Sequence, residues 1–450
     1  MVAPRKRRSR KRHSLNVWMN GRKVGTWTVA ENRPQRFQYV EAWPESQDAR
    51  ILSLSLPFQP GNQPHEGKTV ENFFDNLLPE SKNIRERLQQ KFHARSGQAF
   101  DLLDEIGRDC VGAVQLLPEN EEPRGWDQVI ATPLTEVQVE DQLKAVVAPA
   151  FAGQDEADEI RISIAGAQEK TALLWHEGRW NAPRGATPTT HILKLPLGLV
   201  GNMKANMSTS VENEWLCSKL IAAYGMDVAE CNIQVFGETK ALVVKRFDRR
   251  LAHQGTYWLR LPQEDMCQAT GTSAAAKYET DGGPGMKQIL DLLRGSNQQE
   301  NDRRAFLKAQ ILFWMLAAPD GHAKNFSIFH ERNATYRMTP LYDVLSAWPI
   351  IGNGPNQISW PDARVAMAWR SKNPYKHLSD IQRRHFNLVA ARLGVGKHAE
   401  DIIEELLADT TRVIDKVREQ LPNDFPEHVS QRIFDGLRDS ANRLRNMPAD

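Results

Sequence analysis

The stretch Pro-Asp-Gly-His-Ala-Lys-Asn-Phe-Ser-Ile-Phe at residues 319–329, together with the dipeptide Tyr-Asp at 342–343, decides how this sequence is interpreted. Asp320 precedes Asn325 by five residues, and Asp343 follows Asn325 by eighteen. In kinase-type sites an Asp accepts the proton of the substrate hydroxyl, and an Asn and a later Asp hold the Mg²⁺ ions, in this order along the chain. The spacing therefore indicates a kinase-like fold, provided that the rest of the chain supplies the other parts of such a site.

Two short strands are predicted between these groups, at residues 326–329 and 335–338, around a polar turn. A hairpin there would bring Asn325 and Asp343 close enough to share a metal ion. Taken alone, the same spacing also fits an Asp that caps a helix and an Asn that lies in a turn. Other parts of the chain have to separate these two interpretations.

The bulk composition is that of an ordinary globular protein, and 450 residues are enough for two or three domains. The longest strongly apolar run, residues 309–318, is about half as long as a membrane span requires, so no membrane partner is expected. The basic N-terminus is not followed by the apolar stretch of a signal peptide. The four cysteines are scattered, which fits reduced thiols in the cytoplasm and argues against a zinc site. They are Cys110, Cys217, Cys231 and Cys267.

The positive charge is concentrated at the N-terminus. Seven Lys and Arg residues lie within residues 5–12, and subtracting seven from the formal net charge of +2 leaves −5 for the rest of the chain. Such a run has no apolar surface to bury, so we expect a disordered basic tail over residues 1–14. Two interpretations of the tail stay open: an arm that grips phosphates, or a solvated tail without a dedicated partner.

Hydrophobic periodicity divides the remaining chain into four segments. Residues 15–118 form an N-terminal α+β subdomain, 119–158 a linker and connecting segment, 159–248 a β-rich nucleotide-binding lobe, and 249–450 a helical catalytic lobe. The apolar-faced helix predicted at 303–318 is stopped by Pro319, which places Asp320 directly beyond its end. The sequence thus predicts an α+β, bilobal kinase-like fold.

Each remaining part of a phosphoryl-transfer site has a candidate. Lys194, on a predicted strand, can pair with phosphates, and Glu214, on the following predicted helix, can orient that lysine. The loop at residues 165–170 can lay backbone N–H groups over the phosphates, and residues 246–248 end the lobe where a hinge contacts adenine. Each feature alone also fits a surface charge or a plain turn, and their shared order along the chain is what favours the kinase site.

Two residues of the Asp320–Asn325 loop have alternatives of their own. Lys324 can stabilise the transferred phosphoryl group, or it can be a solvated loop lysine. His322 is interpreted as structural, because a loop His more often forms a local hydrogen bond than takes part in proton transfer.

At these residues the sequence resembles the HipA family, the serine/threonine-kinase toxins of HipA–HipB type II toxin–antitoxin systems. The resemblance extends from about Leu15 to the C-terminus. Its most specific stretches are residues 73–79, 161–174 and 320–325, to which residues 260–268 and 278–285 add support.

The resemblance implies an ATP- and Mg²⁺-dependent protein kinase with a fold related to phosphoinositide kinases. Asp320 would be the catalytic base, and Asn325 and Asp343 would bind Mg²⁺. Ser163 would be autophosphorylated, which ejects the phosphate loop and silences the kinase. The residues that would contact ATP are Ser163, Ala165, Gly166, Ala167, Gln168, Glu169, Lys170, Lys194, Lys245, Arg246, Phe247, His322, Ala323, Lys324, Asn325, Tyr342 and Asp343.

The resemblance also implies partners. Family members phosphorylate glutamate–tRNA ligase, which arrests translation and growth and produces persistence. They pair with HipB, a small helix-turn-helix antitoxin, and the complex represses its own operon on operator DNA. A cytoplasmic protein that is nucleoid-associated in that complex is therefore expected. Additional nucleic-acid contacts are predicted at Arg5, Lys6, Arg7, Arg8, Arg383 and Arg384.

Three departures from the family pattern are visible. Pro319 stands where Thr is expected, Lys245 stands where the hinge usually has Glu, and the family's DNA-touching basic residues have no clear match near residues 390–394. Two other functions therefore stay open. One is a catalytically idle DNA-binding co-repressor that keeps the kinase fold, and the other is a kinase for a small molecule or a lipid headgroup.

Overall fold

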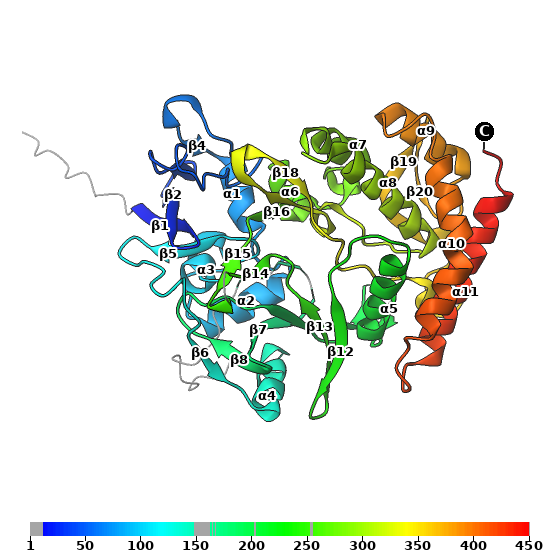
Figure 1. Ribbon diagram of the computed structural model, residues 1–450, viewed down its shortest axis with the longest axis horizontal. Coiled ribbons are helices and arrows are strands. Elements are labelled where there is room, and N and C mark those ends of the chain that lie inside the picture. The colour runs from blue at the N-terminus through cyan, green and yellow to red at the C-terminus, as the bar shows by residue number, and fades with distance from the viewer. Residues whose placement is uncertain are drawn as a thin grey trace, which may run out of the picture.

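Three groups of elements follow one another along the chain, from the N-terminal strands to the C-terminal helices (Figure 1). The computed structural model describes residues 12–147, 163, 165–166, 168–201, 204–252 and 255–449. Residues 1–11 of the predicted tail, with Arg5, Lys6, Arg7 and Arg8, and the predicted ATP contact Ala167 lie outside them. The last three residues of that tail, 12–14, were expected to be disordered but begin the first strand, where they pair with residues 28–30.

The first group is an antiparallel sheet in the order β4-β3-β2-β1-β5 with three helices. Strand β1 pairs with β2 in a hairpin, and Asn20 and Gly21 turn the chain with φ of 45° and 76°. Trp27 of β2 stacks on Phe74 of α1 with 4.0 Å between ring centroids, which joins the sheet to its helices. The bounds are β1 Arg12–Met19, β2 Arg22–Ala30, β3 Arg36–Tyr39, β4 His65–Glu66, α1 Lys68–Asp75, α2 Lys82–Lys91, α3 Ala99–Ile106 and β5 Gln115–Pro118.

The second group is a larger antiparallel sheet in the order β12-β13-β9-β7-β8-β6. Helix α4 packs on one face of this sheet, where Val139 and Leu143, four residues apart, meet Leu193. The segment expected to be a linker thus contributes a strand, β6, and a packed helix. The bounds are β6 Ala131–Pro133, α4 Glu136–Val147, β7 Lys170–His176, β8 Arg179–Pro183, β9 His191–Lys194, β10 Gly198–Val200, β11 Ala205–Met207, α5 Ser210–Ala223, β12 Cys231–Phe236 and β13 Thr239–Lys245.

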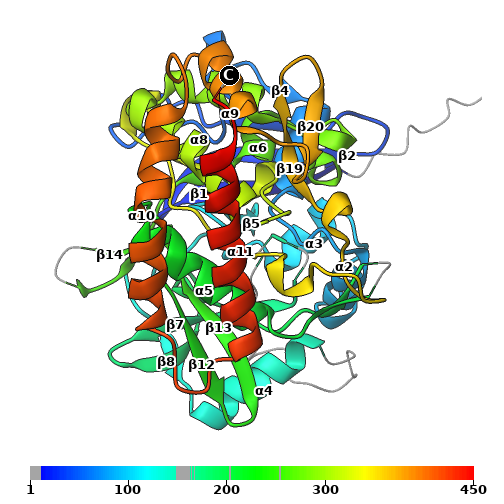
Figure 2. The ribbon, with the colours of Figure 1, turned by 90° about the vertical axis from the view of Figure 1, so that its right-hand side faces the viewer.

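The third group is mainly helical, and α10 and α11 run side by side along its outer face (Figure 2). The sequence predicted a helical lobe that contains the strand pair at residues 326–329 and 335–338. It did not predict the other strands of this group, most of which have only three or four residues and leave little periodicity to read. The bounds are β14 Arg249–Leu251, β15 Trp258–Arg260, β16 Gln263–Asp265, α6 Met266–Ala269, α7 Met286–Leu292, α8 Gln299–Met315, β17 Ser327–His330, β18 Tyr336–Met338, β19 Arg364–Arg370, β20 Pro374–His377, α9 Arg383–Leu393, α10 Glu400–Arg418 and α11 Glu427–Asn446.

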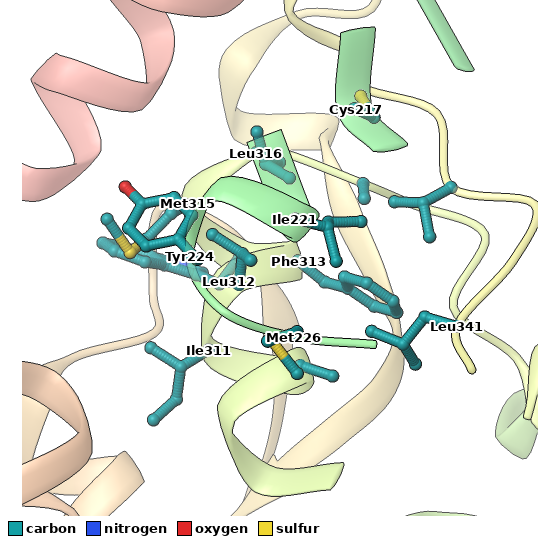
Figure 3. Close-up of a cluster of buried hydrophobic side chains, with 14 of the residues drawn as sticks. Cys217, Ile221, Tyr224, Met226, Ile311, Leu312, Phe313, Met315, Leu316 and Leu341 are labelled. Atoms are coloured by element: carbon teal, nitrogen blue, oxygen red, sulfur yellow. The ribbon is translucent and has the colours of Figure 1, made fainter. Parts of the chain in front are cut away.

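One continuous core joins α5 of the second group to the helical group. Side chains of α5 and its C-terminal end, among them Ile221 and Tyr224, interleave with Leu312, Met315 and Leu316 at the end of α8 (Figure 3). Burial at this density fixes the C-terminal end of α8 relative to the sheet. None of the described helices combines the length and apolar character needed to cross a bilayer.

Candidate active site

The C-terminal end of helix α8 positions Asp320. After Met315 the chain reverses through Ala317, whose φ of 47° is left-handed, and the N–H of Ala318 donates to the carbonyl of Phe313 at 2.8 Å. A Cβ on Gly321 would lie 2.5 Å from the Phe313 ring, so this loop fits against the helix only with glycine. Asp320 therefore stands directly beyond the end of a deeply buried helix.

The predicted hairpin brings Asn325 to Asp343. Strands β17 and β18 pair antiparallel, with Ile328 opposite Met338. The Asn325 side-chain amide donates to the main-chain carbonyl of Asp320 at 2.6 Å and lies 3.5 Å from the carbonyl of Asp343. The backbone of Asp343 is left-handed, with φ of 59°, a conformation that recurs at functional sites. The Asn325 side chain thus links the backbone at Asp320 to the backbone at Asp343.

Lys194 connects the sheet to this loop. Its ammonium donates to Glu214 Oε1 at 2.6 Å, as the sequence predicted, and also to Asp343 Oδ1 at 2.8 Å, which sequence reasoning missed. Burial opposes the charge on Lys194, but the two carboxylates outweigh it and hold its pKa above the ordinary value. Burial likewise opposes ionisation of Asp343, and Lys194 and Lys170 nevertheless hold its pKa well below its usual range.

The predicted phosphate loop rests on the N-terminal subdomain. Gly166 forms a parallel bridge with Pro79, and Glu169 forms an ion pair with Arg87. Gln168 donates from Nε2 to the carbonyl of Leu195 at 2.6 Å. Within the loop, Lys170 Nζ donates to the Ala165 carbonyl at 3.0 Å. This end of the cleft is therefore built from two groups of elements.

Ser163 is completely buried. Its Oγ donates to the carbonyl of Leu77 at 2.7 Å, and its N–H donates to the carbonyl of Asp109 at 3.1 Å. Ser163 is not part of a strand, and its neighbours 161, 162 and 164 lie outside the described residues. A phosphoryl group can reach this hydroxyl only if the segment leaves its place.

Lys245, Arg246 and Phe247 of the predicted hinge all line the cleft, but their side chains have different surroundings. The centroid of the Phe247 ring lies 5.6 Å from that of the Tyr342 ring and 5.7 Å from that of the Phe329 ring, so Phe247 forms part of the cleft wall. Lys245 is exposed and pairs with Glu230 at 3.0 Å. The side chain of Arg246 is buried in an ionic cluster, so its guanidinium is already paired and is not directed at an adenine ring.

That buried cluster was not visible in the sequence. Asp109, at the end of the N-terminal subdomain, accepts from Arg249 Nη2 at 2.9 Å and from Arg260 Nε at 3.2 Å. Asp248 accepts from Arg246 Nη2 at 2.8 Å, and the side chains of all five residues are at most 6% exposed. Charges so deeply buried must pair with one another, and here they join the first group of elements to the end of the second and to β14 and β15 of the third.

Lys324 is buried, so it is not the solvated loop lysine of one interpretation, and its contacts do not leave it free for the other, a bond to the transferred phosphoryl group. Its ammonium donates to Asp265 Oδ2 at 2.6 Å and to Asn76 at 2.8 Å and 3.1 Å, so its three donors are all used. It would have to break one of these bonds to reach a phosphoryl group. Tyr342 donates to the main-chain carbonyl of Lys324 at 2.7 Å and so holds the same loop.

Asp320 itself is only partly enclosed: 46% of its side chain is exposed, toward the cleft. Desolvation by the cleft walls raises its pKa to about 6. The Tyr278 hydroxyl donates to its Oδ1, and His322 Nε2 lies 3.6 Å from the same oxygen. Burial lowers the pKa of His322 to about 4, so this imidazole is neutral near pH 7.

A cleft of about 670 Å³ joins these groups. Ser163, Glu169 and Ala323, three of the predicted ATP contacts, do not line it. The predicted residues that do line it are Ala165, Gly166, Gln168, Lys170, Lys194, Glu214, Lys245, Arg246, Phe247, Asp320, His322, Lys324, Asn325, Tyr342 and Asp343. Sequence reasoning missed Glu80, Lys277 and Tyr278, although residues 278–285 contributed to the family resemblance without an assigned role.

One predicted nucleic-acid contact is corrected by the structure. Arg383 is buried and forms ion pairs with Glu400 and Glu404 of α10, which neutralise it and remove it from the surface. Arg384, the next residue along α9, is exposed. A run of two arginines at the start of a helix cannot reveal which of them faces a neighbouring helix.

A β-rich part and a helical part around one cleft, with a buried Lys–Glu pair and an Asp–Asn–Asp set, define a kinase-like fold, as the sequence predicted. Two family models match this chain: the HipA N-terminal domain over residues 15–117 and the HipA-like C-terminal domain over residues 162–414. The chain therefore belongs to the HipA family.

Individual relatives agree with this assignment. The putative kinase Y4mE of Sinorhizobium fredii is 34% identical, over 89% of this chain and 94% of the relative. The serine/threonine-protein kinase toxin HipA of Shewanella oneidensis is 29% identical, over 68% of this chain and 69% of that protein. A solved Shewanella oneidensis complex of HipA, HipB and operator DNA contains a chain with the same fold, with a TM-score of 0.76, 22% identity, and coverage of 96% and 97% of the two chains.

Proposed function

We propose that this protein is an ATP- and Mg²⁺-dependent serine/threonine protein kinase that acts as a toxin. The observation that carries the proposal is the convergence of Lys194, Asp320, Asn325 and Asp343 on one cleft between the sheet and the helical lobe. Positioning and electrostatics supply most of the catalysis in phosphoryl transfer, and the site provides both.

The oxygen atoms that the site offers as metal ligands fit Mg²⁺. Asn325 uses its Nδ2 as a donor, so its Oδ1 is left as an acceptor, and Asp343 supplies carboxylate oxygen. Mg²⁺ prefers such hard oxygen ligands and usually takes only one or two carboxylates, with phosphates and water completing its shell. When bound there, the ion would neutralise charge on the phosphates. Lys194, with its pKa raised, stays charged and adds a fixed cation beside Asp343.

The protein substrate we propose is glutamate–tRNA ligase, whose phosphorylation would arrest translation and growth and lead to persistence. Incubating the purified protein with γ-labelled ATP and a panel of tRNA synthetases, followed by mass spectrometry, tests this choice. Label on a serine of glutamate–tRNA ligase is the expected result. Label on a different synthetase would reject the substrate, and label only on a small molecule or lipid headgroup would reject protein-kinase activity.

We also propose autophosphorylation of Ser163 as the silencing step. A phosphate dianion cannot replace the Ser163 hydroxyl, which is fully buried against the Leu77 carbonyl, so modification would hold the loop out of its place. The displaced segment would take Gly166 away from Pro79 and open the phosphate end of the cleft.

Ser163→Ala is expected to escape this silencing. After preincubation with ATP, the wild-type protein should lose phosphoryl-transfer activity, while the variant should keep it. Mass spectrometry should find phosphate on the peptide that contains residue 163 in the wild type but not in the variant. Removing one hydrogen bond should cost the variant only about 0.5–1.5 kcal/mol of stability. Ser379→Ala, at an exposed hydroxyl, is the matched control. Equal silencing of the Ser163→Ala and wild-type proteins would refute the switch.

The partners we propose are a HipB-like helix-turn-helix antitoxin and, mainly through that complex, operator DNA. The support is the solved Shewanella oneidensis complex, which contains HipA, HipB and operator DNA. These partners and the proposed substrate would place the protein in the cytoplasm, at the nucleoid when it is in the complex. The domain boundaries predicted from the sequence stay predictions.

Deleting residues 1–11, which lie before strand β1, tests the direct DNA contacts proposed for Arg5, Lys6, Arg7 and Arg8. For each phosphate that the tail no longer neutralises, the slope of log K against log salt should shrink by about 0.9. The truncated complex should therefore bind operator DNA more weakly and with a shallower salt dependence, while the kinase rate should not change. Arg384→Ala probes the exposed arginine of α9 in the same assay, and an unchanged salt slope after truncation would mean that the tail does not contact DNA.

A further inference from the structure

The loop at residues 277–285 forms the wall of the cleft beside the proposed base. The Tyr278 hydroxyl donates to Asp320 Oδ1, and the Tyr278 ring meets the His322 ring edge-on at 4.9 Å between centroids. Burial and the neighbouring Asp320 charge raise the pKa of Tyr278 well above its ordinary value. The phenol therefore stays protonated, and it acts as a hydrogen-bond donor throughout the physiological range.

Contacts on two sides hold this loop in place. On the outer side, Glu279 accepts from the N–H of Ala368 at 2.6 Å and from Arg370 Nε at 2.8 Å, both in β19. On the inner side, the Lys277 carbonyl accepts from the N–H of Ala323 at 3.3 Å, within the Asp320–Asn325 loop. Tyr278 is consequently positioned by β19 and by the loop that carries the base.

A third contact links the loop to the N-terminal subdomain. Lys277 Nζ pairs with Glu80 at 2.5 Å, and the two side chains are only 15% and 14% exposed. Glu80 follows Pro79, whose backbone pairs with Gly166 of the phosphate loop. The wall beside Asp320 and the phosphate end of the cleft are thus tied to the same short segment.

The two carboxylate oxygens of Asp320 are not equivalent. Oδ1 takes the Tyr278 hydroxyl, whereas Oδ2 accepts no hydrogen bond from the described residues. A hydrogen bond on one oxygen fixes the rotation of the carboxylate about its Cβ–Cγ bond, so the other oxygen has a defined direction. The exposed part of this side chain faces the cleft, where an acceptor hydroxyl would approach.

We propose that Tyr278 is the positioning residue for Asp320 and reserves Oδ2 for the hydroxyl of the acceptor serine. This inference rests on the proposed kinase function. In the step it serves, the acceptor Oγ–H proton passes to Asp320 Oδ2, and Oγ forms a bond to the γ-phosphorus. The bond from the γ-phosphorus to the bridging oxygen breaks, and ADP leaves with that electron pair. Tyr278 itself takes no proton from the substrate.

Tyr278→Phe tests the role, because it removes the hydroxyl and keeps the ring against His322. We expect kcat to fall by roughly 10- to 100-fold, the change that corresponds to removing one hydrogen bond to a charged group. The KM for ATP should stay within about twofold, since the nucleotide does not use this hydroxyl. The matched control is Tyr336→Phe, which removes a hydroxyl bonded to the Leu292 carbonyl at 2.5 Å, outside the cleft.

A double-mutant comparison separates positioning from general structural support. If Tyr278 acts through the Asp320 carboxylate, adding Tyr278→Phe to Asp320→Asn should change the residual rate by less than about twofold. Equal losses in both backgrounds would show a structural role and overturn the inference, as would a Tyr278→Phe enzyme as fast as the wild type. If the wild type transfers no phosphoryl group at all, the proposed function fails and this role fails with it.

Discussion

Asp320→Asn is expected to lower the rate of phosphoryl transfer by roughly 10²–10⁴-fold, the usual cost of losing a general base. An amide cannot take the proton of the acceptor hydroxyl. The substitution should leave the site in place, because the main-chain carbonyl of Asp320, rather than its side chain, holds Asn325 at 2.6 Å. Nucleotide affinity, measured by calorimetry, should therefore stay close to that of the wild type while kcat falls.

The pH dependence provides a check on the same variant. Desolvation raises the pKa of Asp320 to about 6, and the base works only when it is ionised, so wild-type activity should rise with pH through about 6. The residual activity of Asp320→Asn should not show this rise with pH around 6. Asp424→Asn, at an exposed position of the helical lobe, is the matched control. Near-full activity of Asp320→Asn would refute the assignment of the base.

Asp109→Ala is expected to cause a large loss of stability. It would leave three buried guanidinium groups, Arg246, Arg249 and Arg260, with one carboxylate between them. Breaking a buried ion pair by removing one partner costs about 3–5 kcal/mol, a large part of the roughly 5–15 kcal/mol that typically stabilises a folded protein. The three arginines hold the pKa of Asp109 well below its usual range although burial opposes this, which shows how strongly the charge is stabilised here.

Thermal unfolding measures this loss, and the midpoint should fall by on the order of 10 °C. Asp127→Ala, an exposed carboxylate of the same part of the chain, should change stability by less than about 0.5 kcal/mol. Asp109→Asn keeps the shape and should still lose much of the stability, because the charge and not the packing is what the arginines require. A midpoint for Asp109→Ala equal to that of the wild type would mean that the cluster does not hold the three groups of elements together.

Local sequence signals predicted the parts of the site that lie on regular elements. The apolar face of α8 and the proline after it placed Asp320 at a helix end, and the β17–β18 strand pattern brought Asn325 to Asp343. The pairing of Lys194 with Glu214 also followed from their positions on a strand and the next helix. Periodicities of two and 3.6 residues carry this information within a short window.

Contacts between distant segments were beyond such reasoning. Asp109 and Arg249 are 140 residues apart, and nothing in either neighbourhood marks them as partners. The same limit explains why Arg246 was assigned to the hinge surface and why Lys324 was considered for the phosphoryl group. Arg246 pairs with Asp109, and Lys324 pairs with Asp265, and both carboxylates are buried and distant in sequence. Tyr278 was missed because no local pattern shows that its hydroxyl would reach Asp320.

The most direct test of the central claim is transfer of label from γ-labelled ATP by purified wild-type and Asp320→Asn proteins, with nucleotide binding measured in parallel. The proposed kinase requires label on a serine in the wild-type reaction, at least about a hundredfold less with Asp320→Asn, and similar ATP affinity for both. Wild-type protein that binds ATP with Mg²⁺ yet transfers no label to itself or to any synthetase would contradict it, and would leave a DNA-binding co-repressor as the function of this fold.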